Sequence, residues 1–201
     1  MKNYVVNKCI NLLRNNGDYD EIKLAEIKYG LEGIYMLISK LIVIIILSIL
    51  LGIIKEVLIF LLIYNFIRMP SFGLHATKSW ICLLSSSIIF IGVPYLAKLV
   101  TIPIWLKIIA GIILILLFFK NAPADTYKRP IVSQKRRNVY KFLSTLVAII
   151  YVFASLFINN TFISNSFILS LVVQSCMISP LVYKIFDLPY DNYKTYLANQ
   201  V

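Results

Sequence analysis

The chain contains one histidine, His75, and Cys82 follows it by seven positions, between two strongly apolar segments. Histidine is the side chain that titrates nearest neutrality, so it is the natural general base of an enzyme. A cysteine thiolate is a strong nucleophile at neutral pH. The pair therefore predicts nucleophilic catalysis by a His–Cys dyad. On spacing alone, an interfacial anchor at His75 and a packing residue at Cys82 fit equally well.

The spacing sets a condition on the backbone between the two residues. In one continuous helix their side chains would share a face but stand about 10.5 Å apart along the axis, at about 1.5 Å per residue. Proton transfer needs a hydrogen bond of about 3 Å. A working dyad therefore requires a helix that begins between His75 and Cys82. Pro70, Ser71 and Gly73 break the preceding apolar segment and permit the chain to turn.

The residues between the dyad candidates supply a helix start. Thr77 or Ser79 can act as the N-cap. With Ser79 at the cap, Cys82 stands in the first turn, where the helix dipole favours the thiolate. Lys78 lies one turn before Cys82 and acts in the same direction.

Several polar residues are candidates to support the dyad. Backbone N–H groups near the nucleophile, or Arg68, can stabilise an oxyanion, and the alternative for Arg68 is a snorkelling cation. Asp125 is the best candidate to orient His75, and its alternative is a turn residue after Pro123. Two more carboxylates precede the first apolar segment and are possible in the same role, Glu26 and Glu32.

The cysteines predict no metal centre. Cys9, Cys82 and Cys176 lie far apart, form no CxxC pair, and have only one histidine to join them. No glycine-rich phosphate loop is present either, so no cofactor is expected. Cys9 and Cys176 are expected to behave as small buried hydrophobic residues.

The composition predicts one all-α, polytopic membrane domain over residues 1–201. Of the 201 residues, 60% are hydrophobic, well above the usual share in a soluble domain. The formal net charge is +11. Basic residues that flank apolar segments set membrane topology, so the charge predicts contact with membrane lipid and not with nucleic acid.

Six apolar segments are expected to cross or enter the membrane, after an amphipathic helix over residues 1–16. The second has an apolar part of only about 16 Å, against a hydrocarbon core of about 30 Å. Pro180 is expected to kink the last segment, with neighbouring helices satisfying the freed backbone groups. The six segments cover residues 34–54, 57–67, 80–96, 104–119, 142–158 and 167–186.

The loop charges orient this set. Positive residues cluster before the first segment, recur at Arg68 and Lys78, and are densest in the stretch 120–141, which is expected to be a basic loop. The alternate connections are poorer in positive charge. The positive-inside rule therefore predicts six crossings with both termini and the His75–Cys82 stretch on the cytoplasmic side.

The block R-x4-G-x-H-A-x5-C, which here comprises Arg68, Gly73, His75, Ala76 and Cys82, resembles the signature of the accessory gene regulator B (AgrB) family. The segment APADTYKRPI, residues 122–131, is similar to a second stretch of that family. Length, span number, the amphipathic start and the basic character agree with it. The resemblance covers essentially the whole chain.

The resemblance implies a membrane cysteine endopeptidase of quorum sensing and virulence regulation in the bacterial cell membrane. Its substrate would be an AgrD-like precursor peptide, held as an enzyme thioester before a thiolactone or lactone ring closes. His75 and Cys82 fall on the catalytic positions, and Arg68 and Gly73 on positions that the family needs. A homodimer is also implied. Some members carry a purely basic run where this chain has Tyr127, Lys128 and Arg129, so Tyr127 departs from the pattern.

The basic residues Lys135, Arg136 and Arg137 have two expected roles. They determine topology. They are also expected to recruit the acidic tail that the family's substrates often carry. Two alternatives to the peptidase stay open from the sequence, a small peptide transporter or exporter without covalent chemistry and a non-catalytic membrane scaffold.

Overall fold

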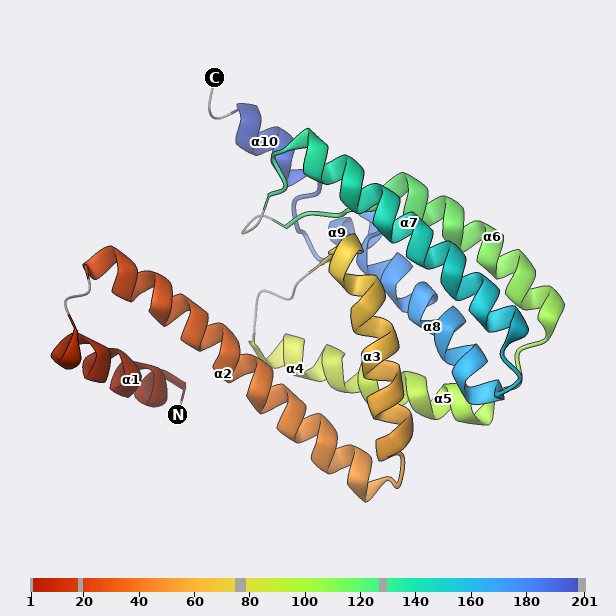
Figure 1. Ribbon diagram of the computed structural model, residues 1–201, viewed down its shortest axis with the longest axis horizontal. Coiled ribbons are helices and arrows are strands. Elements are labelled where there is room, and N and C mark those ends of the chain that lie inside the picture. Colours follow the sequence, from red (N-terminus) through yellow and green to blue (C-terminus); the bar gives the residue numbers. More distant parts are fainter. Residues whose placement is uncertain (1, 18–19, 75–78, 127–129, 199–201) are drawn as a thin grey trace.

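The computed structural model describes residues 2–17, 20–74, 79–126 and 130–198, and these residues form helices joined by short connections (Figure 1). Strand-like structure in the described residues is limited to isolated bridge residues, Thr126 and the pair Phe72 and Ala124. The elements are α1 (Lys2–Asn16), α2 (Glu21–Leu50), α3 (Ile54–Ser71), α4 (Ser79–Ser87), the π-helical turn η1 (Ile88–Gly92), α5 (Val93–Leu99), α6 (Ile104–Asn121), α7 (Gln134–Phe157), α8 (Thr161–Met177), α9 (Pro180–Ile185) and α10 (Asn192–Ala198).

The protein is an all-α membrane protein, as the composition predicts. In the described part of the chain, four helical stretches are long and apolar enough to cross a membrane: Glu21–Leu50, Trp80–Leu99, Ile104–Asn121 and Gln134–Phe157. Two further apolar helices complete the six expected segments. Helix α3 has 18 residues and carries three charged side chains, and α8 has 17 residues.

Several segment boundaries differ from the prediction. Helix α2 begins at Glu21, well before residue 34, because the charged stretch continues the helix and packs on α1. Helix α8 begins at Thr161, where the Asn160 side chain accepts a hydrogen bond from the N–H of Ile163 at 3.0 Å. Pro180 does not kink one long helix. It opens the separate helix α9, at a position where its missing N–H costs nothing.

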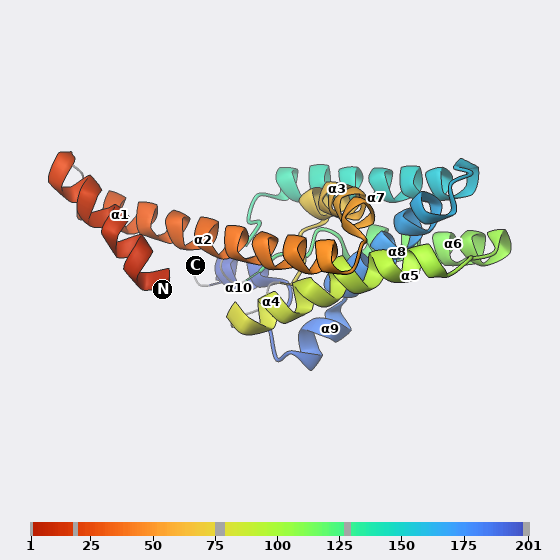
Figure 2. The same ribbon diagram turned by 90° about the horizontal axis from the view of Figure 1, so that it is seen from below.

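The expected amphipathic start is helical, and it folds back on α2. Val6 and Ile10 of α1 are buried against Leu24 of α2. Two ion pairs close the hairpin, Lys2 with Glu32 at 2.9 Å and Arg14 with Glu21 at 2.7 Å. Figures 1 and 2 show α1 and the start of α2 extending away from the other helices, while the later part of α2 lies beside α3 and α4. Part of the apolar face of this amphipathic helix is therefore covered by α2.

The third apolar segment is one continuous helical stretch, in which the π-helical turn η1 joins α4 to α5. Pro94 lies inside it and has no N–H to donate to the preceding turn. The π-helical turn Ile88–Gly92 immediately precedes it. A wider turn relieves the clash between a proline ring and the carbonyl one turn earlier, which explains why the helix continues through Pro94.

Helix α8 lies at the centre of the bundle and packs against α3, α5, α6 and α7. Its polar side chains are buried and mostly bonded to backbone carbonyls, as in Ser170 to Phe167 at 2.8 Å. Small residues also bring α6 close to α7, because a Cβ at Gly111 would lie 2.6 Å from Val152. The C-terminal end of α8 contacts the connection that follows α3.

The connection expected as a basic loop over residues 120–141 is shorter in the structure. Helix α6 continues to Asn121 and α7 begins at Gln134. Lys135, Arg136 and Arg137 therefore lie on the first turn of α7, because this basic stretch continues the helix of the apolar segment that follows. The stretch Ala122–Ile131 remains non-helical where it is described.

Candidate functional site

Cys82 lies in the first turn of α4 and is 8% exposed. Helix α3 ends at Ser71 and α4 begins at Ser79, so the predicted helix start between His75 and Cys82 is confirmed. The Cys82 Sγ accepts a hydrogen bond from the Lys40 Nζ of α2 at 3.4 Å. The nucleophile candidate is therefore buried, near a helix start and in contact with an ammonium group.

Some of the predicted site residues lie outside the described residues. The structure describes nothing of these positions, nor of the side chain of Ser79 at the start of α4. The distance between His75 and Cys82 accordingly stays a prediction. The predicted residues in this group are His75, Lys78, Lys128 and Arg129, together with Ala76, Thr77 and Tyr127 of the motif segments.

Gly73 lies at a point where the chain admits no side chain. Its φ is +112°, which residues with a Cβ rarely adopt, and a Cβ would stand 2.8 Å from the carbonyl oxygen of Met177. Its N–H donates to the carbonyl of Ala124 at 2.8 Å. The next residue, Leu74, donates its N–H to Met177 at 2.9 Å. The chain that leads to His75 is thus fastened to the end of α8 and to residue 124.

Arg68 fastens the same connection from α3. Its guanidinium donates to the Tyr64 hydroxyl at 3.0 Å and to the carbonyl of Leu74 at 3.1 Å. Leu74 immediately precedes His75. The contacts of Arg68 among the described residues therefore hold the backbone beside the predicted general base. Its role as an oxyanion donor and the alternative of a snorkelling cation stay predictions.

Gln174 of α8 supports the candidate site, and none of the sequence motifs predicts it. Its side-chain Nε2 donates to the Ser71 Oγ at 3.0 Å and to the carbonyl of Phe72 at 2.7 Å, and the residue is fully buried. A glutamine inside an apolar segment is itself a signal, because a buried amide is retained where it has partners. Gln174 ties the end of α3 to the centre of the bundle.

Asp125 is 2% exposed, and its carboxylate is occupied by backbone donors. It accepts from the N–H of Ile131 at 3.3 Å, of Asn192 at 3.1 Å and of Tyr193 at 3.0 Å. The last two donors open helix α10, where a carboxylate is electrostatically favoured. These contacts give Asp125 a clear architectural role, since it joins segment 122–131 to the C-terminal helix.

The three basic residues of the α7 start are not equivalent. Lys135 and Arg136 are exposed. The Arg137 side chain is 14% exposed, lies 3.6 Å from the Asp125 carboxylate and places its guanidinium 3.5 Å from the centre of the Tyr193 ring. Arg137 is therefore engaged within the protein, and only the other two present their charge to solvent.

A cavity of about 370 Å³ opens beside this junction. It is bordered by the cationic residues Lys120 and Lys141 and by the inner face of Arg137. Tyr190 also lines it, donates its hydroxyl to the carbonyl of Asn121 at 3.3 Å, and has a pKa raised to about 12 by burial. One carboxylate also lines the cavity, that of Asp191, and it is paired with Lys194 at 2.6 Å. The lining therefore carries more positive than negative side chains.

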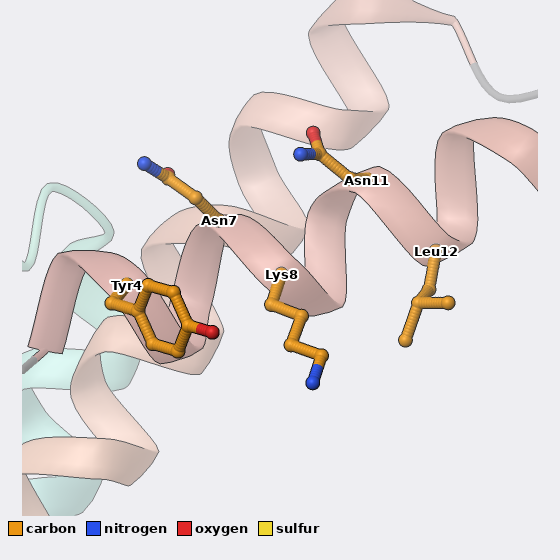
Figure 3. Close-up of a pocket in the computed structure, with 5 residues that line it drawn as sticks. All are labelled: Tyr4, Asn7, Lys8, Asn11 and Leu12. Carbon is orange, nitrogen blue, oxygen red and sulfur yellow. The ribbon is translucent and has the colours of Figure 1, made fainter.

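A second depression, of about 420 Å³, runs along the outer face of α1. Figure 3 shows its lining residues, all from this one helix, with the side chains pointing outward. A groove between neighbouring side chains of a single exposed helix offers no enclosed site, so catalysis is not assigned to it. The lining residues are Tyr4, Asn7, Lys8, Asn11 and Leu12.

Comparisons with known proteins agree on one family. The sequence profile described as "Accessory gene regulator B" (AgrB) matches residues 6–178. An AgrB-like protein of Clostridium acetobutylicum is 34% identical over 172 residues, which cover 86% of this chain and 82% of that protein. Protein FsrB of Enterococcus faecalis is 30% identical, over 88% of this chain and 74% of its own length. An AgrB-like protein of Listeria monocytogenes is 29% identical, over 88% and 87%. No solved structure matches the chain.

Proposed function

Because the chain belongs to the AgrB family, we propose that it is a membrane cysteine endopeptidase that cleaves a quorum-sensing precursor peptide and promotes its cyclisation. The observation that carries the proposal is the position of Cys82, buried in the first turn of α4 and bonded to an ammonium group. A helix start and a neighbouring ammonium group both favour the thiolate, the form that attacks carbonyl carbon, and they oppose the cost of burying its charge.

In the proposed reaction, the Cys82 sulfur attacks the scissile carbonyl carbon of an AgrD-type precursor. His75 accepts the thiol proton and donates it to the leaving amine, so the peptide bond breaks as the thioester forms. A nucleophile within the bound peptide, a cysteine thiol or a serine hydroxyl, then attacks the thioester. Cys82 departs, and the ring closes as a thiolactone or a lactone.

Water must be kept from the thioester, or hydrolysis competes with ring closure. The low exposure of Cys82 supports a site that admits peptide and little water. Arg68, Gly73 and Gln174 support the same site from outside the reacting atoms, because they hold the connection that leads to His75.

Substrate recruitment is proposed for the exposed cations at the start of α7. Lys135 and Arg136 present charge to solvent, and Lys120 and Lys141 border the neighbouring cavity. Such a patch suits the acidic tail of a precursor peptide, since complementary charge steers association. We place this patch and the dyad on the cytoplasmic side of the bacterial membrane, in a chain that crosses six times with both termini inside. A homodimer is proposed on the family likeness alone.

The proposal is tested with purified protein in lipid vesicles and a synthetic AgrD-type precursor. Cys82→Ala and His75→Ala should each abolish cleavage while the variants still purify as folded membrane proteins. Cys9→Ala and Cys176→Ala are the matched controls and should cleave at the wild-type rate. Mass spectrometry of the quenched wild-type reaction should show the peptide attached to Cys82.

Cleavage that survives Cys82→Ala would overturn the peptidase mechanism. If that variant also failed to move a pre-cleaved peptide across the membrane, the exporter alternative would replace it.

A further inference from the structure

Lys40 is the only charged residue in the apolar stretch 34–54. An ammonium group within a membrane-spanning segment is costly, and such residues face the protein interior and carry a function by default. Helix α2 continues through this stretch without a break. Lysine has an ordinary role at the ends of such helices, where it reaches the headgroups. Lys40 lies six residues inside the apolar stretch, about 9 Å along the helix axis, so this role does not explain it.

The side chain of Lys40 ends on the proposed nucleophile. Its Nζ donates to the Cys82 Sγ at 3.4 Å, between residues that are 42 positions apart in the chain. Lys40 is partly buried and Cys82 is 8% exposed. Helices α2 and α4 pack directly on each other, so the contact is part of a helix interface.

We propose that Lys40 is a catalytic residue of the peptidase, whose ammonium group holds Cys82 as a thiolate. This inference rests on the proposed function, because it assigns a group to the same reacting sulfur. A thiolate in a poorly hydrated site is unfavourable without a cation. A charge-assisted hydrogen bond from an ammonium group supplies that cation at contact distance.

The same contact serves both halves of the reaction. In the first half, the thiolate attacks and its negative charge passes to the carbonyl oxygen. In the second half, the internal nucleophile of the peptide displaces the sulfur, which must leave with an electron pair. An ammonium group beside Cys82 stabilises the departing thiolate, so it accelerates ring closure as well as cleavage.

The other charged and titratable groups around the pair come from the neighbouring elements. Helix α4 and the turn η1 contain none besides the cysteine. On α3, the arginine is bonded to the tyrosine hydroxyl, and on α2 the nearest carboxylate is bonded to α1. On α3 the charged and titratable residues are Lys55, Glu56, Tyr64 and Arg68, with Glu56 paired to Lys98. On α2 those nearest to Lys40 in the sequence are Glu32 and Tyr35, and before α4 stand His75 and Lys78, which lie outside the described residues.

The test measures the reactivity of Cys82 without any peptide. In a Cys9→Ser, Cys176→Ser background, Cys82 is the only thiol, and its rate of alkylation by iodoacetamide is followed against pH in detergent. Lys40→Met should raise the pH of half-maximal rate by about one unit or more, because the thiolate loses its cation. Lys40→Arg should keep it near the wild-type value.

The high-pH plateau of the same profile separates chemistry from structure. A variant that only disturbs packing changes the access of the reagent, and so the plateau, without moving the half-maximal pH. Lys28→Met is the matched control, because Lys28 is an exposed lysine on the same helix, and its profile should overlay the wild type. A Lys40→Met profile with an unchanged half-maximal pH would overturn the inference.

Peptide cleavage distinguishes the two proposals. Lys40→Met should lower the rates of cleavage and of ring closure by about tenfold or more, with partial recovery in Lys40→Arg. If Cys82→Ala abolishes cleavage but the alkylation profile of Lys40→Met is unchanged, only the role of Lys40 fails. If Cys82→Ala still cleaves, the peptidase mechanism fails, whatever the profile shows.

Discussion

At the scale of single residues, the proposed site depends on side chains that hold the backbone near the predicted reacting atoms. Arg68 donates a hydrogen bond to the carbonyl of Leu74, and Gln174 donates one to the carbonyl of Phe72. Side chains therefore hold two of the three residues that link the end of α3 to His75. Gly73, between them, is fixed by its own N–H. Ordered backbone is the physical means by which a loop can present a general base accurately.

Gly73→Ala is expected to impair this arrangement. A residue with a Cβ at this φ costs about 1–2 kcal/mol, and the added carbon would also press on the Met177 carbonyl. Precursor cleavage in lipid vesicles should fall by about tenfold or more. Gly33→Ala, at an open position on α2, is the control and should leave cleavage unchanged. Equal rates for both variants would show that the conformation of residue 73 does not matter for catalysis.

At the scale of elements, the junction of segment 122–131, the start of α7 and α10 is built on one buried carboxylate. Asp125 receives three backbone N–H groups and faces Arg137. A charge that loses its partner in such a place is strongly destabilising, at about 3–5 kcal/mol for a fully buried pair. Lys135 and Arg136, the exposed cations that precede Arg137, have no contact of this kind with Asp125.

Charge reversal should therefore show that the basic residues in the first turn of α7 have two different roles. Lys135→Glu with Arg136→Glu should weaken precursor processing most at low salt, where electrostatic steering is strongest, and leave thermal stability in detergent unchanged. Arg137→Glu should lower the melting temperature, because it places a second carboxylate beside Asp125. Unchanged processing in the first variant, at every ionic strength, would remove the recruitment role.

At the scale of the whole molecule, α3, α5, α6 and α7 pack around α8, and the proposed site lies where α2, α4 and the connection after α3 meet. The loop charges predict which end of this bundle faces the cytoplasm. A site for a precursor made in the cytoplasm must open to that side, so orientation and function are linked.

The predicted orientation is measured with single cysteines in a chain that lacks Cys9, Cys82 and Cys176. Asn159→Cys, in the connection between α7 and α8, should react with a membrane-impermeant thiol reagent on intact cells. Lys135→Cys should react only after the cells are opened. Both sites are exposed in the structure, so a difference in labelling reports the side of the membrane. The reverse pattern would invert the assigned topology.

The sequence by itself determined the features that depend on neighbours along the chain. Apolar runs determined the all-α membrane fold, and the residues from Pro70 to Gly73 determined that α3 ends before Cys82, because proline and glycine act on the backbone locally. The positions of helix ends were predicted less accurately, because a charged stretch such as residues 21–33 can continue a helix when another helix covers it.

Only the tertiary structure decided which distant residues meet. The contact between Lys40 and Cys82 crosses 42 positions, and the contact between Gln174 and Phe72 crosses 102. Such pairs depend on the crossing angle and the axial register of packed helices, which hydrophobic periodicity does not specify. The sequence predicts Cys82 as the nucleophile from its type and its place after a helix break. The packing of α2 on α4 placed an ammonium group against it.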